Sequence, residues 1–261
     1  MRRQLDVLQK IKVIEPITGV KAYSQVLLVK KPGTDEKRMC IDYRALNECI
    51  GHMNWPLPNI LHMVDRIGAK KPKIFAKFDM TKGYWQLALS AALRVATAFI
   101  TSIGIFVWNR IPMGLQPASS YFQYCMTTVV LVGLMYEICE SYIDDIIVHA
   151  QHEDDMLKNL KDVFERFRRY NIKLNPKKSI IGLLKIEYVG HQIDAEGMHF
   201  TKEKLSEVAT FATPQGAKGR RSFLGLTQYF AAHVPQYALY ERPLRDVLLK
   251  HHWESWRHMM C

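Results

Sequence analysis

Two adjacent carboxylates, Asp144 and Asp145, lie between short apolar runs in the stretch from Glu140 to Ala150, ESYIDDIIVHA. Apolar, β-prone runs on both sides of a two-residue polar break predict a tight hairpin, and aspartate is a favoured turn residue. Two carboxylates at a hairpin tip repel each other, and a bound divalent cation removes that cost. An ordinary surface turn is the alternative explanation for an isolated Asp-Asp pair.

A third carboxylate, Asp79, lies near the end of the alternating segment from Ile74 to Met80, IFAKFDM. Alternation of this kind predicts a β-strand, and a carboxylate at the end of a strand is well placed to face a cleft. Capping of the next helix is the alternative role for Asp79. The residues alone leave both roles open.

The charge of the chain indicates the class of partner. The 261 residues include 36 basic and 25 acidic ones, a formal net charge of +11, with a pI of about 9.4. This balance favours a polyanionic partner, nucleic acid above all, with an anionic membrane surface as the weaker alternative. A hydrophobic content of 48% and a charged content of 23% are typical of a soluble globular protein.

Several classes of protein are disfavoured by the sequence. No apolar run approaches the roughly 20 residues that span a bilayer. The segment from Met1 to Lys10 is charged throughout and resembles no secretory signal. The five cysteines show no CxxC spacing, which predicts reduced thiols. We therefore expect an intracellular, cytoplasmic protein without membrane partners, and leave nuclear entry open.

The elements that must position the carboxylates alternate between helices and strands up to about residue 200. Expected helices cover residues 4–14, 59–67, 119–132 and 156–167. Expected strands cover residues 24–31, 37–43 and 74–80, two segments within 84–108, and a hairpin within 186–200. From Thr201 onward the pattern predicts helices over residues 202–211, 216–231 and 241–250. The sequence thus predicts an α+β region followed by a small helical subdomain.

The predicted hairpin over residues 24–43 carries four basic side chains, Lys30, Lys31, Lys37 and Arg38. Cations on a hairpin are usually a solvated face. In an enzyme that handles nucleotides they could instead hold a triphosphate. The spacing does not choose between these two roles.

The chain carries the following blocks in one order: VLLVKK, RMCIDYRALN, WPLP, FAKFDMTKGYWQ, TAF, IPMGL, YFQ, SYIDDIIVHA, LNPKKS, EYVGH and RRSFLGLTQYF. This order resembles the reverse transcriptase of long-terminal-repeat retroelements, in particular the Ty3/gypsy-like retrotransposon polyproteins. The resemblance implies an RNA-directed DNA polymerase, a nucleotidyltransferase, with the α+β fold of a right hand. Fingers and a palm with an antiparallel sheet would occupy residues 1–200, and a helical thumb with the start of the connection residues 201–261.

The family's three catalytic, metal-binding aspartates fall on Asp79, Asp144 and Asp145. The resemblance implies two Mg²⁺ ions, with Mn²⁺ as a substitute, which activate a primer 3′-hydroxyl and stabilise charge on the leaving oxygens of a deoxynucleoside triphosphate. Asp79 and Asp144 would be the principal bridging ligands, with Asp145 beside them. Such ions would also remove the repulsion at the hairpin tip.

The resemblance also assigns nucleotide-binding residues. Lys31 and Arg38 match the finger residues that hold the triphosphate. Tyr84 matches an aromatic steric gate, which would collide with a ribose 2′-hydroxyl; core packing is its alternative role. Met113 and Gln123 match positions that line the nucleotide pocket and the template region.

Further positions match the primer-template contacts of the family. These are Tyr142, Val189, Gly190 and His191 near the primer, and Arg220 and Arg221 in the thumb. The thumb would grip the duplex through its phosphates, whereas an exposed helix face is the alternative role of the two arginines.

Some segments depart from the family pattern. SAALRVATAF has Ala91, Ala92 and Ala96 where an acidic pair and a lysine are usual, Pro117 is displaced, and Ser179 stands where a cysteine often follows. No departure touches a metal ligand. We expect a polymerase fragment of a polyprotein, without the protease, ribonuclease H and integrase segments, acting on an RNA or DNA template-primer with dNTPs. The alternative is a catalytically inactive remnant that only binds nucleic acid.

Overall fold

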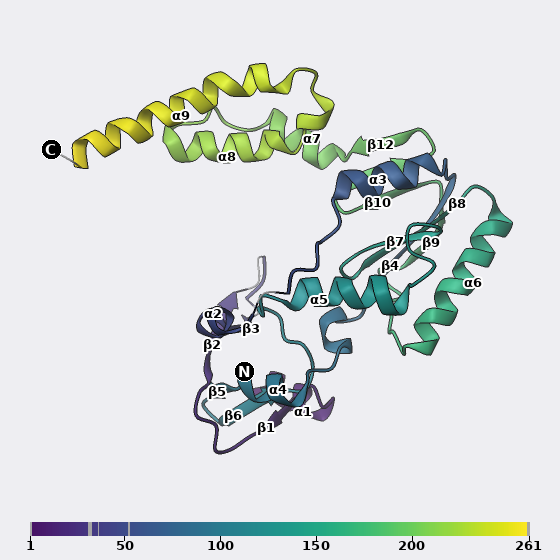
Figure 1. Cartoon of the computed structure of the whole chain (residues 1–261), viewed down its shortest axis with the longest axis vertical. Helices are drawn as coiled ribbons and strands as arrows, with labels where there is room; N and C mark the ends of the chain where they lie inside the picture. Colours follow the sequence, from purple (N-terminus) through teal and green to yellow (C-terminus); the bar gives the residue numbers. More distant parts are fainter. Residues whose placement is uncertain (1, 31–32, 36, 52, 260–261) are drawn as a thin grey trace. The chain divides into compact units, whose positions relative to one another are not determined.

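The computed structural model describes residues 2–30, 33–35, 37–51 and 53–259. The chain divides into two compact units, Met1–His199 and Phe200–Cys261, which are drawn in Figure 1. Over the residues described, the first unit contains three β-sheets and the second is helical. Among the described residues, no helix combines the length and apolar character needed to cross a membrane.

The three aspartates lie on or beside a four-stranded sheet, here called the carboxylate sheet. Its strands follow the order β7 (Cys139–Tyr142), β8 (Asp145–Ala150), β4 (Ile74–Asp79) and β9 (Ile180–Leu183), and neighbouring strands are antiparallel. The predicted strand at 74–80 and the predicted hairpin are confirmed. The tip of the hairpin is corrected: the turn residues are Ile143 and Asp144, whereas Asp145 already pairs with Tyr142 and with Asp79.

The two faces of the carboxylate sheet pack against different elements because side chains alternate along each strand. Ala76, Phe78 and Ile146 belong to a core that also includes residues of α5 (Ala118–Cys125) and α6 (Glu153–Arg169). Phe75 and Ile147 belong to a second core with residues of α3 (Ile60–Ala69), β10 (Lys185–Tyr188) and β11 (His191–Asp194). By the same alternation Lys77, Asp79 and Asp145 share the second face.

Three helices flank this sheet. Helix α3 (Ile60–Ala69) is capped by the Asn59 side chain, which accepts hydrogen bonds from two backbone amides of its first turn. Helix α5 (Ala118–Cys125) continues into a π-helical turn, Met126–Val130. Helix α6 (Glu153–Arg169) has acidic residues in its first turn and arginines in its last, and it packs on β8 and β4 (Figure 1). All three helices were predicted; the π-helical turn was not.

A five-stranded sheet, the N-terminal sheet, forms the other part of the first unit. Its order is β1 (Ile14–Pro16), β6 (Gly104–Trp108), β5 (Phe99–Thr101), β2 (Ser24–Lys30) and β3 (Lys37–Asp42). Around it lie α1 (Arg2–Lys10), α2 (Arg44–Cys49), α4 (Ala91–Ala96) and the 3₁₀ turn η1 (Gly83–Gln86). The predicted hairpin of β2 and β3 is confirmed over these bounds.

The helix predicted over residues 4–14 was too long. Lys12 has a positive φ of 56°, which a right-handed helix does not accommodate. Ile14 lies instead in β1, where it is buried and pairs with Trp108. A long-range strand pairing therefore overrides the helical spacing of the apolar residues.

The segment predicted as one hairpin within 186–200 forms a three-stranded sheet of β10 (Lys185–Tyr188), β11 (His191–Asp194) and β12 (Gly197–Phe200). Strand β9 was missed. Its sequence, IIGL, shows no alternation of polar and apolar residues, because this last strand of the carboxylate sheet exposes the apolar residues Ile180 and Ile181.

The second unit contains α7 (Lys202–Ala209), α8 (Gly216–Gln228), the 3₁₀ turn η3 (Ala231–His233) and α9 (Tyr237–Met259). The ring of Phe200 packs on that of Phe230, with centroids 4.5 Å apart. The first two predicted helices are confirmed with slightly shorter bounds. The third begins at Tyr237 rather than 241 and continues to Met259, with Pro243 inside it.

Candidate active site

The three aspartates are brought together by the register of three strands. Asp79 ends β4 directly opposite Asp145, the first residue of β8, and Asp144 occupies the turn before it. The amide of Met80 donates to the Asp144 carbonyl over 3.4 Å, and the amide of Asn175 donates to the Asp79 carbonyl over 2.8 Å. The strand end and the hairpin tip are therefore joined through their backbones.

The carboxylates concentrate negative charge in a partly buried place. Burial raises the pKa of Asp144, and the neighbouring charges of Asp145 and Asp79 raise it further. Two lysines offset part of this charge: Lys178 Nζ lies 3.1 Å from Asp79 Oδ2, and Lys77 Nζ lies 3.4 Å from Asp145 Oδ1.

The chemistry of this donor set fits a hard divalent cation, because all three side chains offer carboxylate oxygens. The aspartates do not form a closed cage: within the described ranges, the one group whose three donor atoms lie within 4.8 Å of one another is Asp194, Glu196 and His199. An open arrangement suits Mg²⁺, which keeps waters and substrate phosphates among its ligands.

Gln123 holds the hairpin from behind. Its Oε1 accepts a hydrogen bond from the Ile143 amide over 2.8 Å, and its Nε2 donates to the Ser141 carbonyl over 2.9 Å. Ile143 has a positive φ of 56°, a conformation that is costly for a β-branched residue. Gln123 is 0% exposed and does not line the pocket described below. Its predicted role at the nucleotide pocket and template region stays a prediction.

The Gln123→Leu substitution is expected to lower the free energy of unfolding by about 2–4 kcal/mol, because it leaves the partly buried Ile143 amide and the buried Ser141 carbonyl without the Gln123 partner. Urea unfolding measures this loss. Gln151→Ala is the matched control: it removes an exposed amide that donates to the Lys70 carbonyl, and a change within about 0.5 kcal/mol is expected. Equal free energies of unfolding for the two variants would show that the hydrogen bonds of Gln123 to the hairpin do not stabilise the fold.

Gly83 leaves room for Asp144. A Cβ atom on Gly83 would lie 3.0 Å from the Cβ of Asp144 and 3.3 Å from the Phe122 ring. Gly83 is buried and follows Lys82, whose φ of 52° turns the chain from β4 into η1. The glycine thus permits a close approach between η1 and the hairpin.

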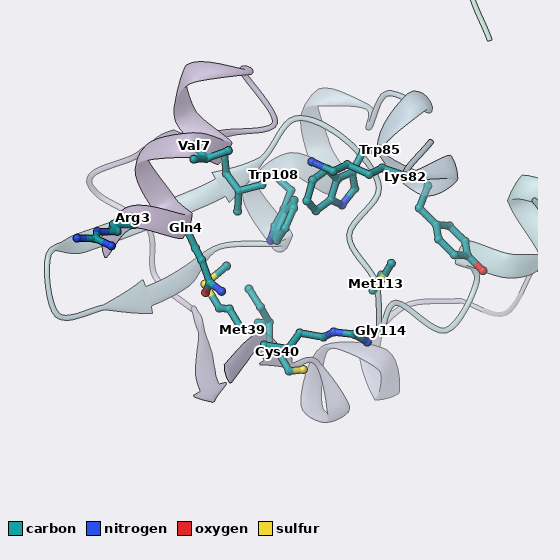
Figure 2. Close-up of a pocket in the computed structure, with 14 residues that line it drawn as sticks. Arg3, Gln4, Val7, Met39, Cys40, Lys82, Trp85, Trp108, Met113 and Gly114 are labelled. Atoms are coloured by element: carbon teal, nitrogen blue, oxygen red, sulfur yellow. The ribbon is translucent and has the colours of Figure 1, made fainter. Parts of the chain in front are cut away.

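A pocket of about 750 Å³ is lined by three of the predicted nucleotide-binding residues, Arg38, Tyr84 and Met113. Met113 is labelled in the close-up of this pocket (Figure 2). Of the other two, Lys31 lies outside the described residues and Gln123 does not line this pocket. Figure 2 shows Trp85 and Trp108 beside each other in the lining, and their ring centroids are 5.9 Å apart. The lining is mainly apolar, with cationic side chains at Arg3, Arg38 and Lys82.

Tyr84 is fixed in place from two sides. Its hydroxyl lies 2.8 Å from Ser119 Oγ, and its ring packs on Phe122 with centroids 5.4 Å apart. The side chain lines the pocket and also packs against both neighbouring cores. Both roles predicted for Tyr84, gate and core packing, are compatible with this position.

The predicted primer-template residues lie in three places. Tyr142 pairs with Asp145, while Val189 and Gly190 form the turn between β10 and β11, where His191 is the first, buried residue. Arg220 and Arg221 lie on α8 in the second unit, and Arg221 is exposed. These roles stay predictions.

Four residues near the carboxylates were not predicted: Lys77, Gly83, Lys178 and Tyr188. One of them had a visible signal, since Lys77 precedes Asp79 by two residues and so shares its strand face. The others act across long sequence separations.

A match to a known protein family identifies the family of this chain. The family described as "Reverse transcriptase (RNA-dependent DNA polymerase)" matches residues 29–193, a range that includes all three aspartates. The chain belongs to the reverse transcriptase family. Members of this family use divalent metal ions, in agreement with the oxygen donors found here.

Curated relatives place this reverse transcriptase among retroelements. It is 32% identical over 256 residues to the Retrovirus-related Pol polyprotein from transposon 412 of Drosophila melanogaster, an alignment that covers 96% of this chain and 20% of that protein. It is 31% identical over 250 residues to the Enzymatic polyprotein of Cauliflower mosaic virus (strain NY8153), covering 94% and 36%. The chain thus spans about a fifth to about a third of these relatives.

The Pol polyprotein from transposon gypsy of Drosophila melanogaster is 30% identical over 241 residues, covering 90% of this chain and 23% of that protein. The predicted resemblance to gypsy-like retroelements is confirmed. Among solved structures, a foamy viral protease-reverse transcriptase in complex with double-stranded DNA matches with a TM-score of 0.85 and 23% identity, covering 95% of this chain and 43% of that one. This match confirms the α+β fold of a reverse transcriptase.

Proposed function

We propose that this chain is the polymerase segment of a retroelement polyprotein and catalyses RNA-directed DNA synthesis. It would transfer a nucleotide from a dNTP to a primer 3′-hydroxyl on an RNA or DNA template. The observation that carries the proposal is the placement of Asp79, Asp144 and Asp145 at one end of the carboxylate sheet, within the range that matches the family.

The residues of this chain would divide the work as follows. Two bound Mg²⁺ ions, or Mn²⁺ in their place, supply activation of the attacking hydroxyl and stabilisation of charge on the leaving oxygens. Asp79 and Asp144 hold the metal, with Asp145 beside them. Arg38, which lines the pocket, would bind the triphosphate together with Lys31 through charge-assisted hydrogen bonds.

Nucleic acid is the partner that this proposal requires. The net charge of +11 supports it, because cationic side chains release counterions from phosphates. Residues 1–200 would serve as fingers and palm, with Tyr142 and the segment from Val189 to His191 near the primer. Residues 201–261 would serve as the thumb, with Arg220 and Arg221 on duplex phosphates. Free thiols at the four described cysteines support a cytoplasmic location.

Tyr84→Ala is expected to admit ribonucleotides. Loss of the ring opens space for a 2′-hydroxyl, and discrimination between dNTP and rNTP should fall by roughly 100-fold, the scale of steric selection in a pocket. Incorporation rates of matched dNTP and rNTP measure this ratio. Tyr121→Ala, which removes an exposed ring, is the control. Unchanged discrimination in the Tyr84 variant would remove this residue from the gate.

Primer extension tests the proposed function itself. A polymerase elongates a labelled primer on an RNA template with dNTPs and Mg²⁺, and stops when the metal is chelated. An inactive remnant would bind the same template with strong salt dependence but leave the primer unchanged. The second outcome would refute the proposal.

A further inference from the structure

Asp145 is held by two side chains that connect it to β10. The Tyr188 hydroxyl donates to the Asp145 carbonyl over 3.3 Å. Lys77 Nζ lies 3.4 Å from Asp145 Oδ1 and donates to the Glu187 carbonyl over 3.3 Å. The Asp145 backbone is therefore bonded to Tyr188, and the Asp145 carboxylate is linked through Lys77 to Glu187. Glu187 and Tyr188 are consecutive residues of β10.

The surroundings make these contacts well defined. Tyr188 is 0% exposed and lies in the core shared with α3, where a phenol needs a hydrogen-bond partner. The side chains of Lys77 and Asp145 are 23% and 34% exposed, so their ion pair is partly shielded from water. Part of the charge at the hairpin is therefore neutralised within the protein.

The turn that follows Tyr188 fixes the position of β10. Val189 and Gly190 have positive φ values of 47° and 80°, and Tyr188 pairs with His191 across the turn. Two successive positive φ values are typical of a tight two-residue hairpin whose backbone matches the strand twist. A rigid β10–β11 hairpin would transmit its position to any group bonded to Glu187 and Tyr188.

We propose that Lys77 and Tyr188 are positioning residues that couple the β10–β11 hairpin to Asp145. Neither side chain would touch the reacting atoms. Lys77 fixes the orientation of the Asp145 carboxylate through the ion pair. Tyr188 fixes the position of the Asp145 backbone through the hydrogen bond to its carbonyl. The consequence for catalysis rests on the proposed function, whereas the coupling is a property of the folded chain.

Two conservative variants separate the contacts. Lys77→Met keeps most of the aliphatic stem and removes the charge, and Tyr188→Phe removes only the hydroxyl. The maximal rate of nucleotide incorporation is expected to fall about tenfold in the first and about threefold in the second, the scale of single hydrogen bonds with and without charge. The KM for dNTP should change less than twofold. Lys77→Arg keeps the charge and should restore most of the rate.

Backbone amide exchange in the metal-free protein gives a readout that needs no catalysis. Both variants are expected to speed exchange in the β7–β8 hairpin by at least about threefold, while exchange in α6 stays unchanged. Lys161→Met and Tyr170→Phe, at exposed positions of α6 and its end, are the matched controls. Thermal unfolding of each variant excludes a general loss of structure.

The outcomes separate the coupling from the function. Unchanged exchange in both variants overturns the coupling, whether or not the chain polymerises. Faster exchange with an unchanged incorporation rate overturns the positioning role. If the unmodified chain extends no primer, the proposed function fails and the exchange measurement alone decides the coupling. The double variant should lose less than the product of the single losses, because both contacts act on one residue.

Discussion

Replacing Asp144 or Asp79 with asparagine is expected to reduce primer extension by at least about 1,000-fold. Metal ions stabilise several kcal/mol of charge in phosphoryl transfer, and about 1.4 kcal/mol corresponds to a tenfold change in rate. Asparagine has nearly the same size but offers one neutral oxygen in place of a charged pair. Asp79 ends β4, and the hairpin turn that carries Asp144 is hydrogen-bonded to the next residue of that chain segment, Met80. Either substitution therefore removes a ligand from the same site.

These variants should fold as well as the parent chain. Burial and the charges of Asp145 and Asp79 raise the pKa of Asp144, so its ionised form is disfavoured in the folded state. Removing one carboxylate relieves that repulsion, and the melting temperature should stay equal or rise. Fluorescence anisotropy with a labelled template-primer should show unchanged binding, since phosphate contacts supply most of the affinity.

Asp65→Asn is the matched control, since Asp65 is exposed on α3. It should extend primers at the parent rate. An Asp144 or Asp79 variant that also extended at the parent rate would refute the metal-ligand assignment.

Gly83→Ala is expected to lower the incorporation rate by roughly 100-fold, the cost of a misplacement near 1 Å in an active site. The new Cβ would meet the Asp144 Cβ at 3.0 Å, a backbone-attached atom that cannot rotate away. The hairpin tip or η1 must therefore shift. Overpacking of this kind should also cost about 1–3 kcal/mol of stability. Rapid-quench incorporation and urea unfolding measure the two effects.

Gly68→Ala is the control, for which the expected change in stability has the opposite sign. Gly68 lies within α3, and a Cβ there would meet no atom within 4 Å. Alanine in a helix should stabilise the chain by about 0.5–1 kcal/mol and leave incorporation unchanged. Parent-like kinetics in Gly83→Ala would mean that the close approach between η1 and Asp144 is not required.

Local patterns explain which parts of the fold were predictable. The strand from Ile74 to Asp79 was visible from alternation, and α6 from its amphipathic spacing and terminal charges. The carboxylate hairpin was visible because apolar runs flank it. Each of these signals lies within one element, where sequence spacing maps directly onto structure.

Long-range contacts explain the remainder. Ile14 was assigned to a helix from the local spacing of apolar residues. That spacing cannot show its pairing with Trp108, which is distant in sequence. Asp145 was assigned to the turn because its pairing with Asp79 depends on the register of β4 and β8. The hydrogen bond from Tyr188 to Asp145 has no local signature at all.

The candidate site shows the same division. The family resemblance supplied the residue types, including the three aspartates and Tyr84. It did not indicate the hydrogen bonds that the Gln123 side chain forms with the backbone of Ser141 and Ile143. The supporting residues of a site depend on packing, which one sequence does not display.

The most direct test of the central claim is single-nucleotide incorporation by this chain on an RNA template, followed as Mg²⁺ is titrated from a chelated start. We expect no incorporation under chelation, incorporation of the matched dNTP that rises with Mg²⁺ and saturates, and recovery with Mn²⁺. Retained template-primer binding without incorporation at any concentration of either metal would contradict it.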